Sequence, residues 1–295
     1  MVEAAFLKTV IQSLALPEAF IDTVNDHYLP LARHLTSTRH EQPPVIIGIN
    51  GLQGTGKTTL SYFLKLILEK DFQKKVVSFS IDDFYLTHLA RQKLAQTIHP
   101  LLGTRGVPGT HDYSLLSDVF EKLKKGERCL IPVFDKALDD RAPEEQWQQV
   151  GSSADIILFD GWCVGSTPQN QDELDRPVNS LEQRDDSNGV WRRYANDMLT
   201  NYQENIFNQL HMLIMLQPPG FESVFAWRKL QENKLRESSS VDRMANRIMD
   251  DSELQHFIQH YERISRHSLS TLPDIADVCI KINAQHDITQ VVYRE

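Results

Sequence analysis

A glycine-rich segment, Gly51–Thr58, constrains this chain more than any other feature. It reads GLQGTGKT and satisfies the spacing GxxxxGK[ST]. Before it stands Val45–Ile49, a short apolar run rich in β-branched residues, and after it Thr58–Glu69 has the apolar spacing of a helix. A buried strand, a glycine-rich turn and a helix N-terminus together surround phosphate oxygens with backbone N–H groups. We therefore predict a P-loop that binds ATP and Mg²⁺.

The residues of this loop have separate predicted roles. Lys57 would reach the β- and γ-phosphates and act in catalysis, and the Thr58 hydroxyl would bind Mg²⁺. The glycines would let the backbone approach the phosphates closely. The residues expected to contact the nucleotide are Gly51, Gln53, Gly54, Thr55, Gly56, Lys57, Thr58 and Thr59.

Four further apolar runs resemble the first and alternate with segments of helical spacing. This alternation is typical of a parallel sheet with helices on both faces. We expect an α/β protein with a P-loop NTPase fold and a doubly wound, mainly parallel sheet. The runs are Val76–Ile81, Asp155–Phe159, Met212–Leu216 and Val278–Ile282, and the later helical segments are Tyr113–Lys124, Val190–Leu210 and Phe221–Arg236.

Residues 1–42 precede this pattern. Their apolar side chains recur at helical spacing, with breaks at Pro17 and Pro30. We predict a helical N-terminal extension over 1–42 and one P-loop kinase domain over 43–295. The polar stretch Thr167–Asn188 is expected to form an excursion or long loop.

Charge and composition limit the partners. A net charge of −9 over 295 residues argues against a general nucleic-acid binder. Cys129, Cys163 and Cys279 lie far apart and lack metal-ligand spacing. Met1–Leu16 lacks the pattern of a signal peptide, and Met212–Leu216 is too short to span a bilayer. We expect a cytoplasmic protein without nucleic-acid or membrane partners, and its oligomeric state stays open.

Acidic residues follow two of the predicted strands. Asp82 and Asp83 follow Val76–Ile81, and Asp160 follows Ile156–Phe159. Ligands of doubly wound folds lie at the carboxyl ends of strands, and phosphoryl transfer needs one carboxylate near Mg²⁺ and one that accepts a hydroxyl proton. We assign Asp82 as the base and a metal ligand, and Asp160 as the metal-side carboxylate. Asp83 is the alternative base, since adjacent strand residues point to opposite faces; either residue could instead cap a turn.

Five further blocks are distinctive: Ser80–His88, Leu101–Asp112, Val133–Lys136, Phe159–Gly165 and Trp227–Gln231. In this order they resemble the D-glycerate 3-kinase family, distant relatives of uridine kinase, phosphoribulokinase and pantothenate kinase. The resemblance runs from about Pro44 to the C-terminus. It implies that the γ-phosphate of ATP is transferred to the 3-hydroxyl of D-glycerate. Members of the family usually carry Glu where Asp160 stands, so this shorter carboxylate would reach Mg²⁺ with the help of a water.

A hydroxy acid requires donors for its carboxylate. Arg105 suits this role because its guanidinium can hold a carboxylate with two bonds. His111 and Lys136 would add donors, and Asp83 and Tyr85 complete the predicted substrate site.

These residues also have structural alternatives. Arg105 could form an ion pair with Asp112, Lys136 could pair with Asp135, and His111 could make a structural hydrogen bond in a tight loop. The loop Ala137–Pro143 lacks the Gly-rich spacing of some relatives, so the acceptor is less defined than the phosphoryl chemistry.

Arg228 lies in Phe221–Arg236, a segment expected to carry positive charge over the phosphates and to stabilise the transferring group. The alternative is an amphipathic helix whose charges simply cover its outer face. His256, His260 and His267 have near-helical spacing without acidic or Cys ligands, which favours a solvated helix face over a metal site.

Other functions remain possible at this stage. A GTPase switch would need an Asn-Lys-x-Asp sequence, whereas the only Asn-Lys pair, Asn233-Lys234, is followed by Leu-Arg. The chain could also be a kinase for pantothenate, a nucleoside or a sugar, or a non-catalytic ATP-binding scaffold. The intact Lys57 and Asp82 positions weigh against a scaffold.

Overall fold

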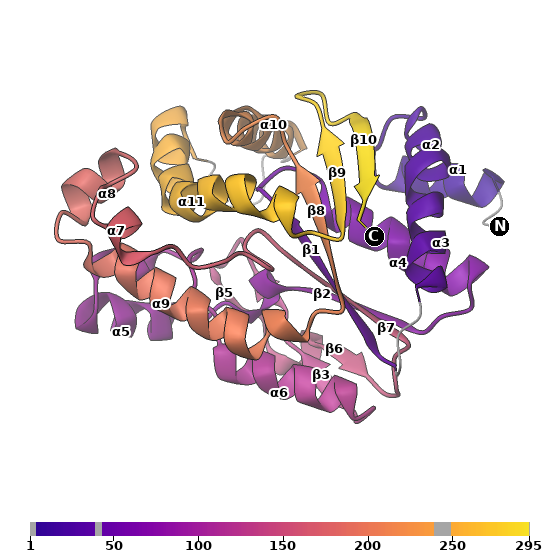
Figure 1. The fold of residues 1–295 in the computed structure, drawn as a ribbon, viewed down its shortest axis with the longest axis horizontal. Coiled ribbons are helices and arrows are strands. Elements are labelled where there is room, and N and C mark those ends of the chain that lie inside the picture. The colour runs from indigo at the N-terminus through magenta and orange to yellow at the C-terminus, as the bar shows by residue number, and fades with distance from the viewer. Residues whose placement is uncertain (1–3, 39–42, 239–248, 295) are drawn as a thin grey trace.

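A six-stranded sheet forms the centre of the fold (Figure 1). The computed structural model describes residues 4–38, 43–238 and 249–294, except for the side chains of 231–238. Five neighbouring strands are parallel, and the last strand adds an antiparallel edge. The predicted mainly parallel sheet is thereby confirmed. In spatial order the strands are β10 (Ile288–Tyr293), β9 (Val278–Ile282), β8 (Met212–Gln217), β1 (Val45–Gly51), β7 (Ile156–Gly161) and β2 (Val76–Ser80).

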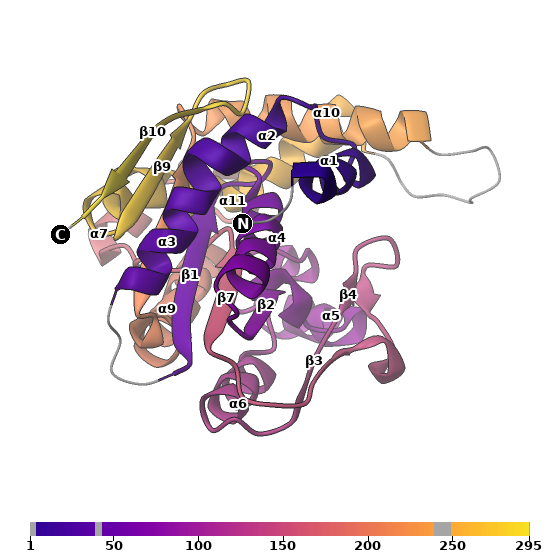
Figure 2. The ribbon, with the colours of Figure 1, turned by 90° about the vertical axis from the view of Figure 1, so that its right-hand side faces the viewer.

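Helices cover both faces of the sheet because successive strand residues point to opposite sides. In β1, Ile46 packs into one core and Ile47 into the other. Figures 1 and 2 show the two helical layers that build these cores. No helix in the described ranges has both the length and the apolar composition that crossing a bilayer requires. One layer contains α6 (Tyr113–Lys124), α9 (Val190–Asn205) and α11 (Asp251–Thr271), and the other contains α1 (Ala4–Ser13), α3 (Leu29–Ser37) and α4 (Lys57–Asp71).

The N-terminal helices contribute to the same hydrophobic core as the sheet. Leu31 and Leu35 of α3 are buried in a cluster that includes Ile47 of β1 and Phe63 of α4. The ring centroids of Tyr28 and Phe63 lie 6.1 Å apart. The extension therefore covers the sheet together with α4, and between α1 and α3 it contains α2 (Phe20–Thr23) and a π-helical turn, Val24–Tyr28.

Most predicted boundaries shift by one or two residues, and two differ in the kind of structure that follows the element. The strand expected over Val76–Ile81 ends at Ser80, and Ile81–Phe84 forms a 3₁₀ turn capped by the Ser80 hydroxyl. The helix expected over Val190–Leu210 ends at Asn205 and is followed by a 3₁₀ turn, Phe207–Gln209.

Short elements between α4 and β7 form a lobe beside the sheet, at the lower right of Figure 2. Two small antiparallel ladders occur there, which the apolar pattern did not reveal because each strand is only two or three residues long. The elements are α5 (His88–Thr97), a 3₁₀ turn at Pro100–Gly103, β3 (Cys129–Ile131) with β6 (Gln148–Val150), β4 (Phe134–Asp135) with β5 (Asp140–Arg141), and a 3₁₀ turn at Glu144–Gln146.

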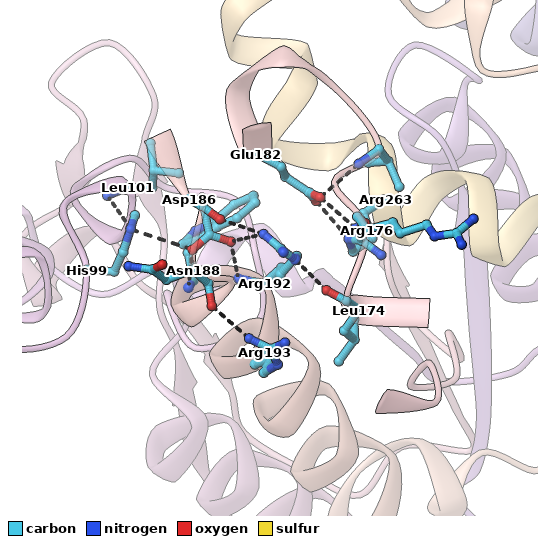
Figure 3. Close-up of polar contacts among 12 residues, drawn as sticks. His99, Leu101, Leu174, Arg176, Glu182, Asp186, Asn188, Arg192, Arg193 and Arg263 are labelled. Atoms are coloured by element: carbon cyan, nitrogen blue, oxygen red, sulfur yellow. Dashed lines mark hydrogen bonds and ion pairs between the residues drawn. The ribbon is translucent and has the colours of Figure 1, made fainter. Parts of the chain in front are cut away.

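Two buried ion pairs fix the predicted excursion to the helices behind it (Figure 3). Glu182 pairs with Arg263 of α11 at 2.6 Å, and Asp186 pairs with Arg192 of α9 at 3.0 Å. The excursion contains two short helices, α7 (Gln171–Leu174) and α8 (Ser180–Asp185); the remaining helical elements are α10 (Glu222–Ser238) and a 3₁₀ turn at Leu272–Asp274.

The histidines of α11 do not form a uniformly solvated face, so that prediction is wrong for His260. Its side chain is buried, and its ring lies edge-on to Trp191 with centroids 5.8 Å apart. Burial, followed by the charge of His256, lowers the pKa of His260 to about 4. Within the described ranges, His, Cys, Asp and Glu side chains form no group of three suited to hold a metal ion.

Candidate active site

The carboxyl ends of β1, β7 and β2 meet at a cleft of about 570 Å³. Parallel strands bring their carboxyl ends to one edge, which is where doubly wound folds bind ligands. The cleft contains most of the charged side chains predicted for the site. Its lining includes Gln53, Gly54, Lys57, Thr58, Asp82, Asp83, Lys136, Asp160 and Arg228.

The glycine-rich loop turns its lysine inward. Lys57 Nζ donates a hydrogen bond to the Leu52 carbonyl over 3.1 Å, and Thr55 Oγ1 donates to the same carbonyl over 2.8 Å. Burial lowers the pKa of Lys57, although Asp160 and Asp82 oppose this shift. Gly51 and Thr55 are buried beneath the loop surface, and Gly56 and Thr59 are half-buried.

Gly54 is required by close packing as well as by backbone conformation. Its φ is +83°, and a Cβ atom there would lie 2.8 Å from Cβ of Trp227. His286 Nε2 donates to the Gly54 carbonyl over 2.8 Å, and its ring lies 4.4 Å from that of Trp227. The loop is therefore held between α10 and the β9–β10 turn. Sequence reasoning missed His286 because it lies in the turn before the edge strand β10, far from the motif in sequence.

Asp82 and Asp83 lie in the 3₁₀ turn after β2, and both line the cleft. The strand alternation used to separate them does not apply in a turn, so that argument was wrong. Asp83 accepts a hydrogen bond from Ser80 N over 2.9 Å and thereby caps the turn. Burial raises the pKa of Asp83 to about 6, and the charges of Asp82 and Asp160 contribute.

Lys136 pairs with Asp82 and not with its neighbour Asp135. Lys136 Nζ donates to Asp82 Oδ2 over 2.9 Å, whereas Asp135 accepts from the backbone of the hairpin turn. Burial acts to raise the pKa of Asp82, but the charge and hydrogen bond of Lys136 outweigh it and lower that pKa to about 2. The ion pair thus keeps the proposed base charged and weakly basic.

Asp160 ends β7 with a buried carboxylate. Ser61 Oγ of α4 donates to Asp160 Oδ2 over 3.2 Å. Burial raises the pKa of this carboxyl, with Lys57 acting in the opposite direction. Together with Thr58 in the same cleft, Asp160 supplies the oxygen ligands that Mg²⁺ prefers, and Mg²⁺ usually takes only one or two carboxylates besides phosphates and water. The donor set therefore fits the predicted cation.

Tyr85 and His111 form a buried layer behind Asp82. Their rings stack with centroids 4.5 Å apart, and both side chains are under 4% exposed. His111 Nδ1 is hydrogen-bonded to the Tyr202 hydroxyl at 3.2 Å, and burial lowers the pKa of His111 to about 4. Their side chains do not appear among the described residues that line the cleft.

Tyr261 of α11 joins this layer, although it was not predicted. Its hydroxyl donates to the Arg105 carbonyl over 3.1 Å, and its ring lies edge-on to Trp162. Burial and then the charge of Asp82 raise the pKa of Tyr261, while Arg105 lowers it. The phenol is therefore within electrostatic reach of both Asp82 and Arg105.

Arg105 is ion-paired with Asp139, and Asp112 is instead the partner of Arg141 at 3.1 Å. The alternative predicted from the sequence, an ion pair between Arg105 and Asp112, is therefore wrong. Arg105 does form an ion pair, but its partner is Asp139. Arg141 also donates to the Tyr85 carbonyl over 3.1 Å. Arg105 is not among the described residues that line the cleft.

Arg228 of α10 lines the same cleft as the carboxylates. Val224 of the same helix, and Phe221 just before it, are buried with Leu254 and Ile258 of α11, so this helix is amphipathic and also presents a cation to the cleft. The side chains of Gln231, Lys234 and Arg236, which are the further polar residues of this segment, lie outside the described residues.

Comparison with known proteins agrees with this architecture. Residues 46–167 match the Phosphoribulokinase / Uridine kinase family. An uncharacterized kinase of Schizosaccharomyces pombe is 34% identical over 231 residues, which cover 75% of this chain and 79% of that protein. The chloroplastic D-glycerate 3-kinase of Arabidopsis thaliana is 29% identical over 242 residues, covering 78% of this chain and 49% of that protein.

A solved structure extends the likeness over nearly the whole chain. D-glycerate 3-kinase from Cryptococcus neoformans superimposes with a TM-score of 0.73 at 26% identity, covering 93% of this chain and 99% of that one. The sequence relatives, the shared fold and the P-loop cleft lead to one assignment. This chain belongs to the phosphoribulokinase/uridine kinase family of P-loop kinases.

Proposed function

We propose that this kinase transfers the γ-phosphate of ATP to the 3-hydroxyl of D-glycerate. The observation that carries the proposal is a single cleft that contains the P-loop residues Lys57 and Thr58 together with the carboxylate Asp82. A phosphate cradle next to a candidate base is what phosphoryl transfer to an alcohol requires. The choice of D-glycerate is supported by the names of the Arabidopsis and Cryptococcus relatives.

The nucleotide would occupy the P-loop side of the cleft. Lys57 would bind the β- and γ-phosphates, and Thr58 and Asp160 would hold Mg²⁺. When bound, Mg²⁺ neutralises charge on the phosphates. Arg228, which also lines the cleft, would stabilise the negative charge of the transferring group.

The acceptor would occupy the side formed by Asp82 and Lys136. Asp82 would orient the acceptor hydroxyl and accept its proton as the oxygen attacks the γ-phosphate. Lys136 now binds the same carboxylate oxygen at 2.9 Å. A carboxylate with a pKa of about 2 is a weak base, so displacement of Lys136 by the acceptor would make Asp82 a stronger one.

The test is acceptor-dependent ADP release by the purified protein with ATP and Mg²⁺. D-Glycerate, L-glycerate, pantothenate, uridine and pentose phosphates would be compared at equal concentrations. We expect turnover with D-glycerate, and a phosphomonoester at its 3-position by NMR. Turnover with another acceptor alone would keep the kinase and refute this substrate, and ATP binding without turnover on any of them would favour a non-catalytic role.

A further inference from the structure

The carboxylate of Asp139 lies among three basic side chains. Arg91 Nη2 donates to its Oδ2 over 2.6 Å, and His88 Nδ1 lies 3.5 Å from the same oxygen. Arg105 Nη1 binds its other oxygen, Oδ1. One carboxylate therefore bridges two guanidinium groups, as a bound organic anion would.

The arginine and the aspartate of this contact differ in burial. The Arg91 side chain is 0% exposed, and its Nη1 donates to the Leu86 carbonyl over 3.1 Å. Its Nε is buried and has no hydrogen-bond partner among the residues described. Asp139 is 39% exposed, has a φ of +53°, and follows Leu138, which is 75% exposed. The cationic side is fixed in the fold, and the anion stands on an exposed hairpin tip.

Phe134 orients the two guanidinium groups. The ring of Phe134, in β4, has the Arg91 guanidinium carbon 5.6 Å and the Arg105 guanidinium carbon 5.5 Å from its centroid. Such contacts hold planar cations in place. Two arginines fixed by one ring form a preorganised carboxylate site whether or not Asp139 occupies it.

The same hairpin also contacts the proposed base. Lys136 follows β4 and binds Asp82, while Asp139 precedes β5 and binds the arginines. The hairpin thus places a cation on Asp82 and an anion on Arg105. A hydroxy acid offers the complementary groups, a hydroxyl for Asp82 and a carboxylate for Arg105. The Tyr261 hydroxyl donates to the Arg105 backbone carbonyl over 3.1 Å, and the charges of Asp82 and Arg105 shift its pKa in opposite directions.

We propose that Arg91 and Arg105 form the site for the acceptor's carboxylate, and that Asp139 fills this site until that carboxylate replaces it. The inference rests on the proposed function, which it deepens by naming the groups that select an acidic acceptor. A fully buried arginine needs an anion at all times, since an uncompensated buried charge is strongly destabilising. The exchange keeps Arg91 paired in both states and draws the hairpin, with Lys136, away from Asp82.

The test replaces Asp139 by Asn. Asparagine tolerates a positive φ and keeps an oxygen for Arg91, while the competing charge is removed. Arg91 then lacks a counter-charge until an acid binds, so the variant should be less stable, and binding is measured only after circular dichroism shows a native spectrum. If Asp139 occupies the site about nine-tenths of the time, apparent affinity for the acceptor rises about tenfold when it no longer competes. The matched control is Asp135→Asn, which retains the oxygen that accepts from the Ala137 N–H in the same hairpin.

The readout is calorimetric binding of D-glycerate and D-lactate with the P-loop filled by ADP and Mg²⁺, together with KM for D-glycerate. D-Lactate carries the carboxylate without a 3-hydroxyl. We expect Asp139→Asn to bind both acids about tenfold more tightly and to lower KM, and Asp135→Asn to match the wild type. Adding Arg105→Gln to Asp139→Asn should abolish the gain. Unchanged or weaker binding by Asp139→Asn would overturn the proposal and leave Asp139 as a structural counter-ion.

The result also separates this inference from the proposed function. If the wild type does not phosphorylate D-glycerate and Asp139→Asn still gains affinity for D-lactate, the carboxylate site stands and D-glycerate is the wrong acceptor. If D-glycerate is phosphorylated and Asp139→Asn gains no affinity for either acid, the kinase assignment stands and the carboxylate site is refuted.

Discussion

The buried ion pair between Glu182 and Arg263 allows a quantitative test of what holds the excursion to α11 (Figure 3). Glu182 is 0% exposed and accepts three hydrogen bonds. Arg263 Nε donates to Oε1 over 2.7 Å, Arg263 Nη2 to Oε2 over 2.6 Å, and Val178 N to Oε2 over 3.0 Å. The change Glu182→Gln preserves the shape but leaves one oxygen, so at least one of these donors would face an NH₂ group.

The expected loss follows from the burial of both partners. Arg263 is only 5% exposed, so it would stay buried without a counter-charge. Removing one member of a buried pair lowers the free energy of unfolding by about 3 to 5 kcal/mol. For a chain of 295 residues the entropy of unfolding is about 0.6 kcal/mol per kelvin, so Tm should fall by about 5 to 8 °C.

Scanning calorimetry of the two purified proteins measures this difference, provided that unfolding is reversible. The control is Asp175→Asn, which removes the exposed partner of Arg193 in a pair of 2.9 Å. Exposed pairs contribute at most about 1 kcal/mol, so this control should lower Tm by less than about 2 °C. A shift of Glu182→Gln as small as that of the control would refute the reasoning, because it would mean that water or another group compensates Arg263.

Three further predictions concern the cleft. Lys57→Ala should weaken ATP binding by about tenfold or more in calorimetry, because a charge-assisted contact to the phosphates is lost; unchanged binding would contradict the assignment of the cradle. Asp82→Asn should reduce kcat by about 10² to 10⁴ while leaving ATP affinity intact. If Asp83→Asn is the slow variant instead, the base is Asp83. The pKa of Asp83 rises from 3.8 to about 6 on folding. Between pH 4 and 6 the carboxyl of Asp83 therefore binds more protons in the native than in the unfolded state, so its contribution to the free energy of unfolding should fall as pH rises over this range. Denaturant titrations should show a smaller fall for Asp83→Asn, and an equal fall would contradict the shift.

The sequence predicted the sheet well because the signals there are local. Each parallel strand is buried on both faces, so Val45–Ile49 and Met212–Leu216 are continuous apolar runs that few other structures produce. The edge strand β10 escaped detection because it is half-exposed and its apolar residues lack a regular pattern. Its presence nevertheless matters for the site, since the turn before it carries His286 to the P-loop.

Which acidic and basic groups pair could not be predicted from their neighbours in sequence. Lys136 and Asp82 are 54 residues apart, and Arg105 and Asp139 are 34 apart. As the alternative to substrate binding, sequence reasoning paired each cation with a nearby Asp, whereas the hairpin between β4 and β5 brings distant groups together. Loop geometry of this kind depends on tertiary packing, which apolar periodicity does not encode.

The pairing in the hairpin also bears on when the kinase can act. With Lys136 on Asp82, the carboxylate has a pKa of about 2 and accepts a proton poorly from an alcohol. Under our proposal the acceptor, and not ATP, removes Lys136 from this position. An acceptor that binds Arg105 and Asp82 would displace both Asp139 and Lys136. The base would then gain strength only when the acceptor is in place, which favours transfer to the acceptor over transfer to water.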